Sequence, residues 1–544
     1  MSPMWQQNYT PLSGSIALSA LVAAVPIFVL MFLLGVLRKP AWLASLFGLG
    51  AAAAVALVVY GMHAGTLASA IAYGAAFGLF PIGWVVFTAI LLYNITVETG
   101  KFQIVKDSVG SLTEDRRLQA LLIAFAFGAF IEGAAGFGTP VAVSAAMLSG
   151  LGFSPFYAAG ICLLANTAPV AFGSIATPIL TLAGITGLPL DRLSAGVGRV
   201  CAPVSLIVPA YLVLVMGGWR ALRGVLPAAA LCGIAFAGTQ FLVSNYIGPQ
   251  LTDILSSLAA IGALVLLFKL WKPKEGFKFD AHSSIQTIPP RHPTSELLIA
   301  WAPYMLLVVF VLLWGYKPLQ VKLNLASQLF TWPGLHNVIL RVPPVVSKPS
   351  PYAAPYTFNW LSAPGTACLF AAILSAIVLR MPAARFARVF LSTVRQLLLA
   401  ELTIASVLAL AFLMNYSGAT ATLGLAFAAT GVFFPFFSAL LGWLGVFLTG
   451  SDTAANALFG NLQVITAGKL GMNAVLMASS NSAGGVMGKM ISLQSVAVAS
   501  CATAMKPDDE GRLFRFTLRH SILLASLTGL LVVFYTYVAP QLAP

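Results

Sequence analysis

Long apolar runs, separated by short stretches that hold most of the charges, make up most of this chain. A helix needs about 20 apolar residues to cross the roughly 30 Å hydrocarbon core of a bilayer. Runs of this kind predict membrane spans near residues 15–37, 41–61, 68–96, 193–217, 224–244, 251–268, 297–315, 361–379, 394–414 and 520–538. We therefore expect an all-α polytopic membrane protein, whose first run stays as a span because no basic segment precedes it.

Composition and charge support the same class of protein. The chain is 59% hydrophobic and 8% charged, whereas a soluble domain is about 25% charged. The net charge of +14 lies mainly in short loops between spans, which is the pattern of cytoplasmic loops rather than of nucleic-acid binding. The loops predicted to be cytoplasmic contain Arg38 and Lys39, residues 101–117, Arg220 and Arg223, and residues 269–291, 380–395 and 506–519.

Two regions do not fit a simple alternation of spans. With these loops on one side, residues 118–185 and 423–503 must each cross the membrane an odd number of times. The first region contains about two long apolar stretches, each broken by Gly, Pro or Asn, and the second region poses the same puzzle. One full span plus a broken or re-entrant hairpin satisfies the parity. The prediction is about twelve transmembrane helices plus two hairpin-like elements, with a long, proline-rich external loop at 316–360.

These two regions resemble each other. Gly-Ala-Phe-Ile-Glu-Gly at 128–133 aligns with Gly-Val-Phe-Leu-Thr-Gly at 445–450, an offset of 317 residues. Ala-Asn-Thr-Ala at 165–168 aligns with Ser-Asn-Ser-Ala at 480–483, an offset of 315. The segments are entered from opposite sides, so they are inverted repeats, whose interface is the usual place of a transport site.

The repeats suggest a division of the chain. Residues 1–270 form a first membrane half that contains repeat 1, at about 68–217. Residues 271–360 are loops that flank one span, at about 297–315. Residues 361–544 form a second membrane half that contains repeat 2.

Isolated acids mark the candidate site. Glu132 is the only charged residue from Leu118 to Leu190, and glycines and a proline surround it. An ionisable group at membrane depth is costly, and broken backbone there lines a cavity or is buried in protein. Asp452 holds a similar place among small residues in the second repeat. We expect both acids to couple to protons; the alternative is that their small neighbours serve helix packing.

Lys489 is the candidate counter-charge, since it lies well inside an apolar region. A buried ammonium needs a partner, such as an acid or a bound carboxylate; the alternative is a lysine that reaches towards the interface. The candidate substrate-binding residues are Gly133, Gly136, Thr139, Asn166, Thr167, Ser451, Thr453, Asn456, Asn481, Ser482 and Lys489. Asn166 and Asn481 would suit helix breaks beside Pro169 and Gly484-Gly485. For Glu98, interfacial pairing near Lys101 is preferred over function. Glu401 could belong to a proton path or simply lie at a shallow depth in the membrane.

These motifs resemble those of the L-lactate permease family. The resemblance is carried by residues 128–140 continued as Val-Ala-Val-Ser to 144, by Leu-Ala-Asn-Thr-Ala-Pro at 164–169 and by Gly-Ser-Asp-Thr at 450–453. It extends over essentially the whole chain. It implies a bacterial inner-membrane secondary transporter that takes up lactate, and in some members glycolate, with protons. The loop pattern adds that both termini lie in the periplasm.

Our hypothesis is proton symport of a small 2-hydroxymonocarboxylate by alternating access. Lys489 and backbone amides would hold the carboxylate, and Asn or Ser the hydroxyl. Glu132 is the preferred proton carrier because its surroundings are more apolar, and Asp452 could pair with Lys489. The alternatives are sodium-coupled transport of another small carboxylate, since Asn, Ser and carbonyl groups also suit Na⁺, and a passive channel. The sequence contains no catalytic or metal-binding constellation, so we expect neither an enzyme nor a cofactor, and no nucleic-acid partner.

Overall fold

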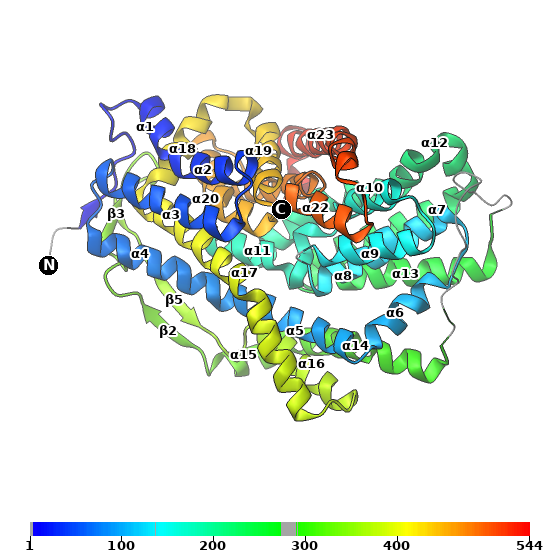
Figure 1. Ribbon diagram of the computed structural model, residues 1–544. Helices are drawn as coiled ribbons and strands as arrows, with labels where there is room; N and C mark the ends of the chain where they lie inside the picture. Colours follow the sequence, from blue (N-terminus) through cyan, green and yellow to red (C-terminus); the bar gives the residue numbers. More distant parts are fainter. Residues whose placement is uncertain (1–3, 137, 274–289, 291) are drawn as a thin grey trace.

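The computed structural model describes residues 4–136, 138–273, 290 and 292–544. Within them, eleven helices are long and apolar enough to cross a membrane, or twelve if one bent pair is counted as a span. The helices pack side by side, and the short strands gather at one end, near the N-terminus (Figure 1). The predicted all-α polytopic class is confirmed.

Most predicted spans correspond to helices whose bounds differ by a few residues, but the helices at 383–417 and 507–537 begin 11 and 13 residues before the predicted spans. The helices outside the two hairpin-containing regions, 116–186 and 419–502, are α1 (Ile16–Ala23), α2 (Val25–Met31), η1 (Phe32–Val36), α3 (Ala41–Val58), α4 (Ala64–Phe77), η2 (Gly78–Gly83), α5 (Trp84–Glu98), α6 (Lys101–Gly110), α12 (Leu190–Tyr246), α13 (Thr252–Leu270), α14 (Thr294–Gly315), α15 (Lys317–Asn324), α16 (Pro364–Val378), α17 (Ala383–Ser417) and α23 (Pro507–Tyr537). The backbone of α12 is non-helical at Gly217, Gly218 and Val225. This interruption lies where the sequence predicts two separate spans.

The first repeat contains a hairpin and a broken helix pair. The helices α7 (Arg116–Gln119), η3 (Ala120–Phe127) and α8 (Gly128–Ala134) are followed by α9 (Thr139–Gly150), which packs back on α8. At the tip, Gly136 and Gly138 have positive φ angles of 63° and 81°, a conformation that favours glycine. The chain then continues through α10 (Pro155–Ala165), η4 (Val170–Phe172) and α11 (Gly173–Thr186), with a bend of 64°.

The second repeat has the same order of elements. The hairpin consists of α19 (Phe434–Thr449) and α20 (Asp452–Leu470), which pack on each other, and Gly450 at its tip has a φ of 71°. The chain enters it through α18 (Ala419–Phe427) and η5 (Ala428–Phe433) and leaves it through α21 (Ala474–Lys489) and α22 (Leu493–Ala502). The crossing parity predicted such a hairpin in each region.

One sequence-based expectation about a helix break is wrong. Asn166 does lie at the end of α10, but Asn481 and the glycines Gly484 and Gly485 lie inside α21. A Cβ atom at Gly484 would lie 2.1 Å from the carbonyl oxygen of Ala439. The glycines therefore let α19 approach α21 closely, as small residues do in membrane helix packing.

The proline-rich stretch 316–360 is more ordered than a loop. The strands β2 (Gln328–Thr331) and β5 (Pro355–Phe358) form an antiparallel pair. The strand β3 (Ile339–Arg341) pairs with β4 (Ser350–Pro351) and with the N-terminal β1 (Trp5–Gln6). These sheets lie beside α4 at one end of the helices (Figure 1).

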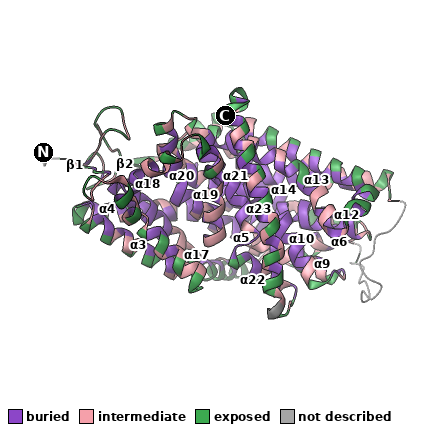
Figure 2. Cartoon of the chain, turned by 90° about the horizontal axis from the view of Figure 1, so that it is seen from above, coloured by how far each residue is buried: buried purple, intermediate pink, exposed green. Residues whose placement is uncertain are grey.

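The distribution of buried residues fits a protein that faces lipid. Buried residues form the interior of the helix assembly, while exposed ones lie along its periphery (Figure 2). Many exposed side chains are apolar: Val58 is 83% exposed and Leu270 is 88% exposed. Such apolar surface would be unusual in water but matches the hydrocarbon of a bilayer.

Candidate functional site

A cavity of about 580 Å³ lies between the two repeats and is lined by Glu132, Asp452 and Lys489. These residues come from α8, the start of α20 and the end of α21, three elements that meet near the hairpin tips. The volume lies within the range typical of small-molecule sites. The structure thus brings together around one cavity the three ionisable residues that the sequence analysis selected.

Glu132 lies in a wall made of glycines. A Cβ atom at Gly173 would lie 2.6 Å from Glu132 Oε1, and one at Gly136 would lie 3.4 Å from it. Glu132 is 4% exposed, and its Oε2 has no hydrogen-bond partner among the described residues. The Asn166 amide lies close to this carboxyl without a hydrogen bond of normal geometry. The glycines therefore make the room that the carboxyl group occupies.

Asp452 is held by hydrogen bonds instead. The Ser482 hydroxyl donates to its Oδ2 at 2.5 Å, and the Asn456 amide donates at 3.4 Å. Behind Asn456, the amide of Asn481 donates to Asn456 Oδ1 at 2.9 Å, and Gln463 donates to Asn481 Oδ1 at 3.0 Å. This chain of buried amides fixes the orientation of Asp452 from the side away from the cavity.

Lys489 lies near both acids. Its Nζ donates to the carbonyl oxygen of Gly450 at 2.6 Å, at the tip of the second hairpin. It also interacts electrostatically with Glu132 and Asp452. Within the described part of the chain, neither acid is within ion-pair distance of Lys489. One ammonium group thus lies near two carboxyl groups without being bound directly to either.

The other predicted residues divide into two groups. Ser451 and Thr453 line the cavity, together with Gly138 and Thr177, which the sequence analysis did not select. The predicted residues that do not line it are Gly133, Gly136, Thr139, Asn166, Thr167, Asn456, Asn481 and Ser482. Of these, Asn456 and Ser482 support Asp452, whereas the Thr167 hydroxyl, in the turn after α10, donates to the Leu164 carbonyl at 2.8 Å.

The sequence analysis missed Asp253. This acid is the second residue of α13, is 1% exposed, and neither of its carboxyl oxygens has a hydrogen-bond partner among the described residues. It interacts electrostatically with Glu132. The signal in the sequence was an acid at the start of an apolar run, which is also the ordinary place for a harmless helix-end charge.

Two weaker candidates are placed differently. Glu98 does form an interfacial ion pair, but its partner is Arg385, at 2.9 Å, rather than Lys101. Glu401 lies on α17, and a Cβ atom at Gly83 would lie 1.9 Å from its Oε2. Its neighbour Ala400 lines the cavity, while Glu401 itself fills the space over the η2 turn.

Comparison with known proteins identifies the family. The family model of L-lactate permease matches residues 19–539. The L-lactate permeases of Salmonella typhimurium and Bacillus subtilis are each 44% identical to this chain over 99% of it and 100% of their own length. A glycolate permease of Escherichia coli is 43% identical, over 98% of both chains. Among solved structures, the Neisseria gonorrhoeae MtrF efflux pump has a TM-score of 0.48 at 14% identity, over 87% of this chain and 84% of that one.

The match extends from the first span to the last, and so includes both repeats and the cavity between them. Permeases move solutes across membranes, and this chain is accordingly a transporter rather than an enzyme. The chain belongs to the L-lactate permease family.

Proposed function

We propose that this protein imports L-lactate, or a related 2-hydroxymonocarboxylate such as D-lactate or glycolate, across the bacterial inner membrane by proton symport with alternating access. Its relatives are named for lactate and for glycolate, which share a carboxylate with a neighbouring hydroxyl. The observation that carries the proposal is the cavity between the repeats, where Lys489 lies near Glu132 and Asp452.

The charges around this cavity support coupling to protons. If Glu132 and Asp452 were both ionised while a carboxylate was bound, three negative charges would surround one ammonium. Buried charges are costly unless they are paired. Binding of a proton to one of the acids reduces this imbalance, so the anion and the proton stabilise each other in the same state of the transporter. Reciprocal stabilisation of this kind is what couples two ligands.

The two acids have different surroundings, and we assign them different roles. Asp452 is fixed by Ser482 and Asn456, and it contributes to the shape and polarity of the substrate site. Glu132 has an unpartnered oxygen and glycine walls, so it is the group that we expect to take up and release the proton. Lys489 would exchange part of its contact with the Gly450 carbonyl for the carboxylate of the substrate.

The substrate hydroxyl requires a polar neighbour at the same cavity. Ser451 and Thr453 line it and flank Asp452 at the start of α20. The Ser451 hydroxyl accepts from the Ala454 amide at 3.2 Å, so its own proton remains free to be donated. A hydroxyl group there can form a hydrogen bond with the hydroxyl of a 2-hydroxy acid. A carboxylic acid without that hydroxyl cannot form this bond and would bind less well.

Uptake into proteoliposomes tests the function. An imposed inward proton gradient should drive accumulation of radiolabelled L-lactate above the external concentration, and a protonophore should abolish it. Replacement of external Na⁺ by choline should leave uptake unchanged. A requirement for Na⁺ would favour the sodium-coupled alternative, and equilibration without accumulation would favour a channel. Competition by unlabelled D-lactate, glycolate and pyruvate would then define the substrate class.

A further inference from the structure

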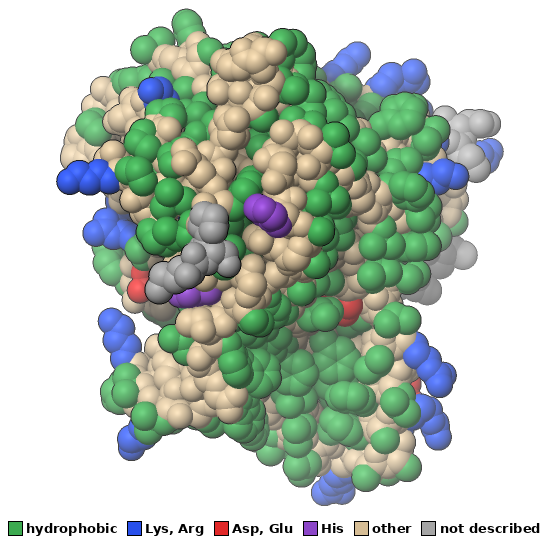
Figure 3. Space-filling view, turned by 90° about the vertical axis from the view of Figure 1, so that its left-hand side faces the viewer, with side chains coloured by type: hydrophobic (Ala, Val, Ile, Leu, Met, Phe, Trp, Pro, Cys, Tyr) green, Lys and Arg blue, Asp and Glu red, His purple; other side chains and the backbone are tan. Residues whose placement is uncertain are grey.

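A second and larger cavity lies at the end of the molecule where the sheets are. Its volume is about 1020 Å³, and it is lined by the ends of α11, α17 and α20 and by the segment 341–359. Figure 3 looks onto the end from which the N-terminus emerges, where Lys and Arg side chains are spread around the margin and acidic ones are few. The predicted orientation puts this end outside the cell, since the turns at Gly187 and Gly418 follow outward-going spans.

This second cavity, the outer cavity, lies in line with the central cavity, which is the one lined by Glu132, Asp452 and Lys489. The same three helices line both, and the lining changes between Pro178 and Gly184 in α11, between Leu408 and Phe412 in α17, and between Ala457 and Asn461 in α20. At about 1.5 Å per residue, the two cavities are separated by roughly 6 to 9 Å along these helices. They are therefore successive compartments of one path.

An apolar layer closes the path between them. Leu182 and Leu410 are fully buried there, and Phe459 is almost so. A Cβ atom at Gly460 would lie 2.6 Å from Leu182 Cδ1, so α11 and α20 are in close contact at this level. A solute in the outer cavity cannot reach Lys489 until this layer separates.

The outer cavity is built for an anion. Its lining includes Arg341 and Lys469, and none of the described residues that line it is Asp or Glu. The Arg341 guanidinium carbon lies 4.7 Å from the centre of the Tyr352 ring, and its Nη2 donates to Ser350 Oγ at 3.4 Å. The Arg341 Nε is buried and has no hydrogen-bond partner among the described residues. An arginine whose face is stacked and whose Nε has no partner suits a carboxylate.

The sheets hold this arginine in place. Arg341 ends β3 and pairs in register with Ser350 of β4. Tyrosine hydroxyls of the membrane helices anchor the same segment: Tyr416 donates to the Ala353 carbonyl at 3.2 Å, and Tyr73 to the Pro355 carbonyl at 3.0 Å. The strand pairing and these two hydrogen bonds therefore hold Arg341 near the end of α17.

We propose that the outer cavity is a second binding site for the carboxylate substrate, in which Arg341, assisted by Lys469, holds the anion before it passes to the central cavity. This inference rests on the proposed function, because it takes the same anion as ligand. A cationic site at the mouth of the path raises the local concentration of the anion and speeds its association, an effect that salt screens.

Substrate kinetics of one variant and its control test the outer site. In vesicles that expose the outer cavity, Arg341→Gln should raise the KM for L-lactate roughly tenfold, as loss of a charge-assisted contact does, and leave Vmax within about twofold. The variant should also lose most of the dependence of uptake on ionic strength. Lys348→Gln removes an exposed charge from the same segment, outside the cavity lining, and should behave like the unchanged protein.

Two further measurements separate binding from folding. Lys469→Gln changes an exposed residue at the end of α20 and should raise the KM about threefold even if Arg341→Gln does not assemble. In vesicles of the opposite orientation, where the substrate approaches the central cavity first, neither variant should change the KM. An unchanged KM for both variants, or equal changes in both orientations, overturns the outer site. If the unchanged protein moves no carboxylate, the proposed function itself fails.

Discussion

Asp253 packs against Gly133: a Cβ atom on this glycine would lie 2.8 Å from the Asp253 Cβ. Gly133 follows Glu132, so two buried acids from α13 and α8 lie in neighbouring positions. Asp253 interacts electrostatically with Glu132, so removing one acid changes how readily the other binds a proton. We predict that Asp253→Asn keeps lactate uptake but makes its dependence on external pH less steep. Initial rates at a series of pH values measure this, and an identical pH profile would remove Asp253 from the proton pathway.

Glu132→Gln should separate transport from proton coupling. The amide fits the same glycine-lined space but cannot take up and release a proton. We expect proton-driven accumulation of L-lactate to disappear, while exchange of labelled for unlabelled L-lactate across the membrane continues. Glu98→Gln, which removes an exposed acid paired with Arg385, is the control and should retain accumulation. Full accumulation by Glu132→Gln would show that another group carries the proton.

Lys489→Ala should weaken substrate binding in the central cavity. A hydrogen bond to a charged group contributes about 1.5–3 kcal/mol, which corresponds to a rise in KM of roughly 10- to 100-fold. Lys489→Arg keeps the charge and should have a smaller effect. The measurement is the concentration dependence of L-lactate exchange in proteoliposomes. A KM that does not change in Lys489→Ala would exclude this lysine from the substrate site.

The sequence was most informative where a charged residue interrupts an apolar run. Hydropathy located the spans, and the parity of crossings indicated hairpins in 118–185 and 423–503. Glu132, Asp452 and Lys489 stood out because each is isolated in an apolar stretch, and all three line the central cavity. These predictions rest on the cost of burying charge. A charged residue isolated in an apolar stretch can be recognised from the local sequence alone.

What the sequence did not give depends on contacts between distant segments. Asp253 lies at a helix start, where an acid is ordinary, and only its packing on Gly133 makes it a neighbour of Glu132. The partner of Glu98 is Arg385, 287 residues away. Gly484 and Gly485 were predicted to mark a helix break, but glycine permits both a break and close helix packing. Only the position of α19, which packs against these glycines, shows that the second interpretation is correct.

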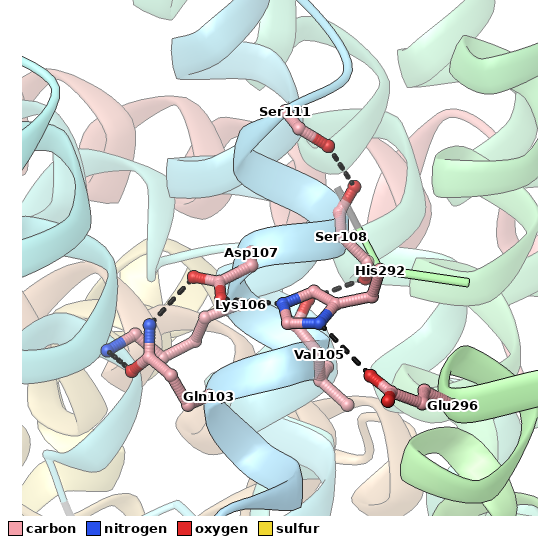
Figure 4. A network of polar contacts seen from close by, with 8 residues as sticks. All are labelled: Gln103, Val105, Lys106, Asp107, Ser108, Ser111, His292 and Glu296. Atoms are coloured by element: carbon pink, nitrogen blue, oxygen red, sulfur yellow. Dashed lines mark hydrogen bonds and ion pairs between the residues drawn. The ribbon is translucent and has the colours of Figure 1, made fainter. Parts of the chain in front are cut away.

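His292 connects α6 and α14 outside the spans. Its Nε2 lies 2.9 Å from Asp107 Oδ2, and its Nδ1 lies 3.3 Å from Glu296 Oε2 (Figure 4). The hydrogen bond to Asp107 is the main cause that raises the pKa of His292, and Glu296 adds to it. Because the pKa is raised in the folded protein, this contact stabilises the fold below the ordinary histidine pKa of about 6.5 and stops doing so as pH rises through the folded value.

We therefore predict that His292→Gln lowers the melting temperature of the detergent-solubilised protein at pH 5.5 but not at pH 9. Thermal unfolding at the two pH values measures the difference. His63→Gln, at an exposed residue before α4, is the control and should melt like the unchanged protein at both. A loss of the same size at pH 5.5 and pH 9 would mean that the neutral imidazole, not its charge, makes the contact.

Gly484 tests whether close packing of α19 on α21 supports the site. A Cβ atom there would lie 2.1 Å from the Ala439 carbonyl oxygen, and backbone cannot move aside as a flexible side chain can. Gly484→Ala should cost about 1–3 kcal/mol of stability and, because Ser482 lies on the same helix, should also weaken substrate binding. Gly262→Ala adds the same methyl group to α13 in open space and should be neutral. Melting temperature and the KM for L-lactate are the measurements. If Gly484→Ala matched Gly262→Ala in both, the helices would have room to separate, and this glycine would not set the position of Asp452.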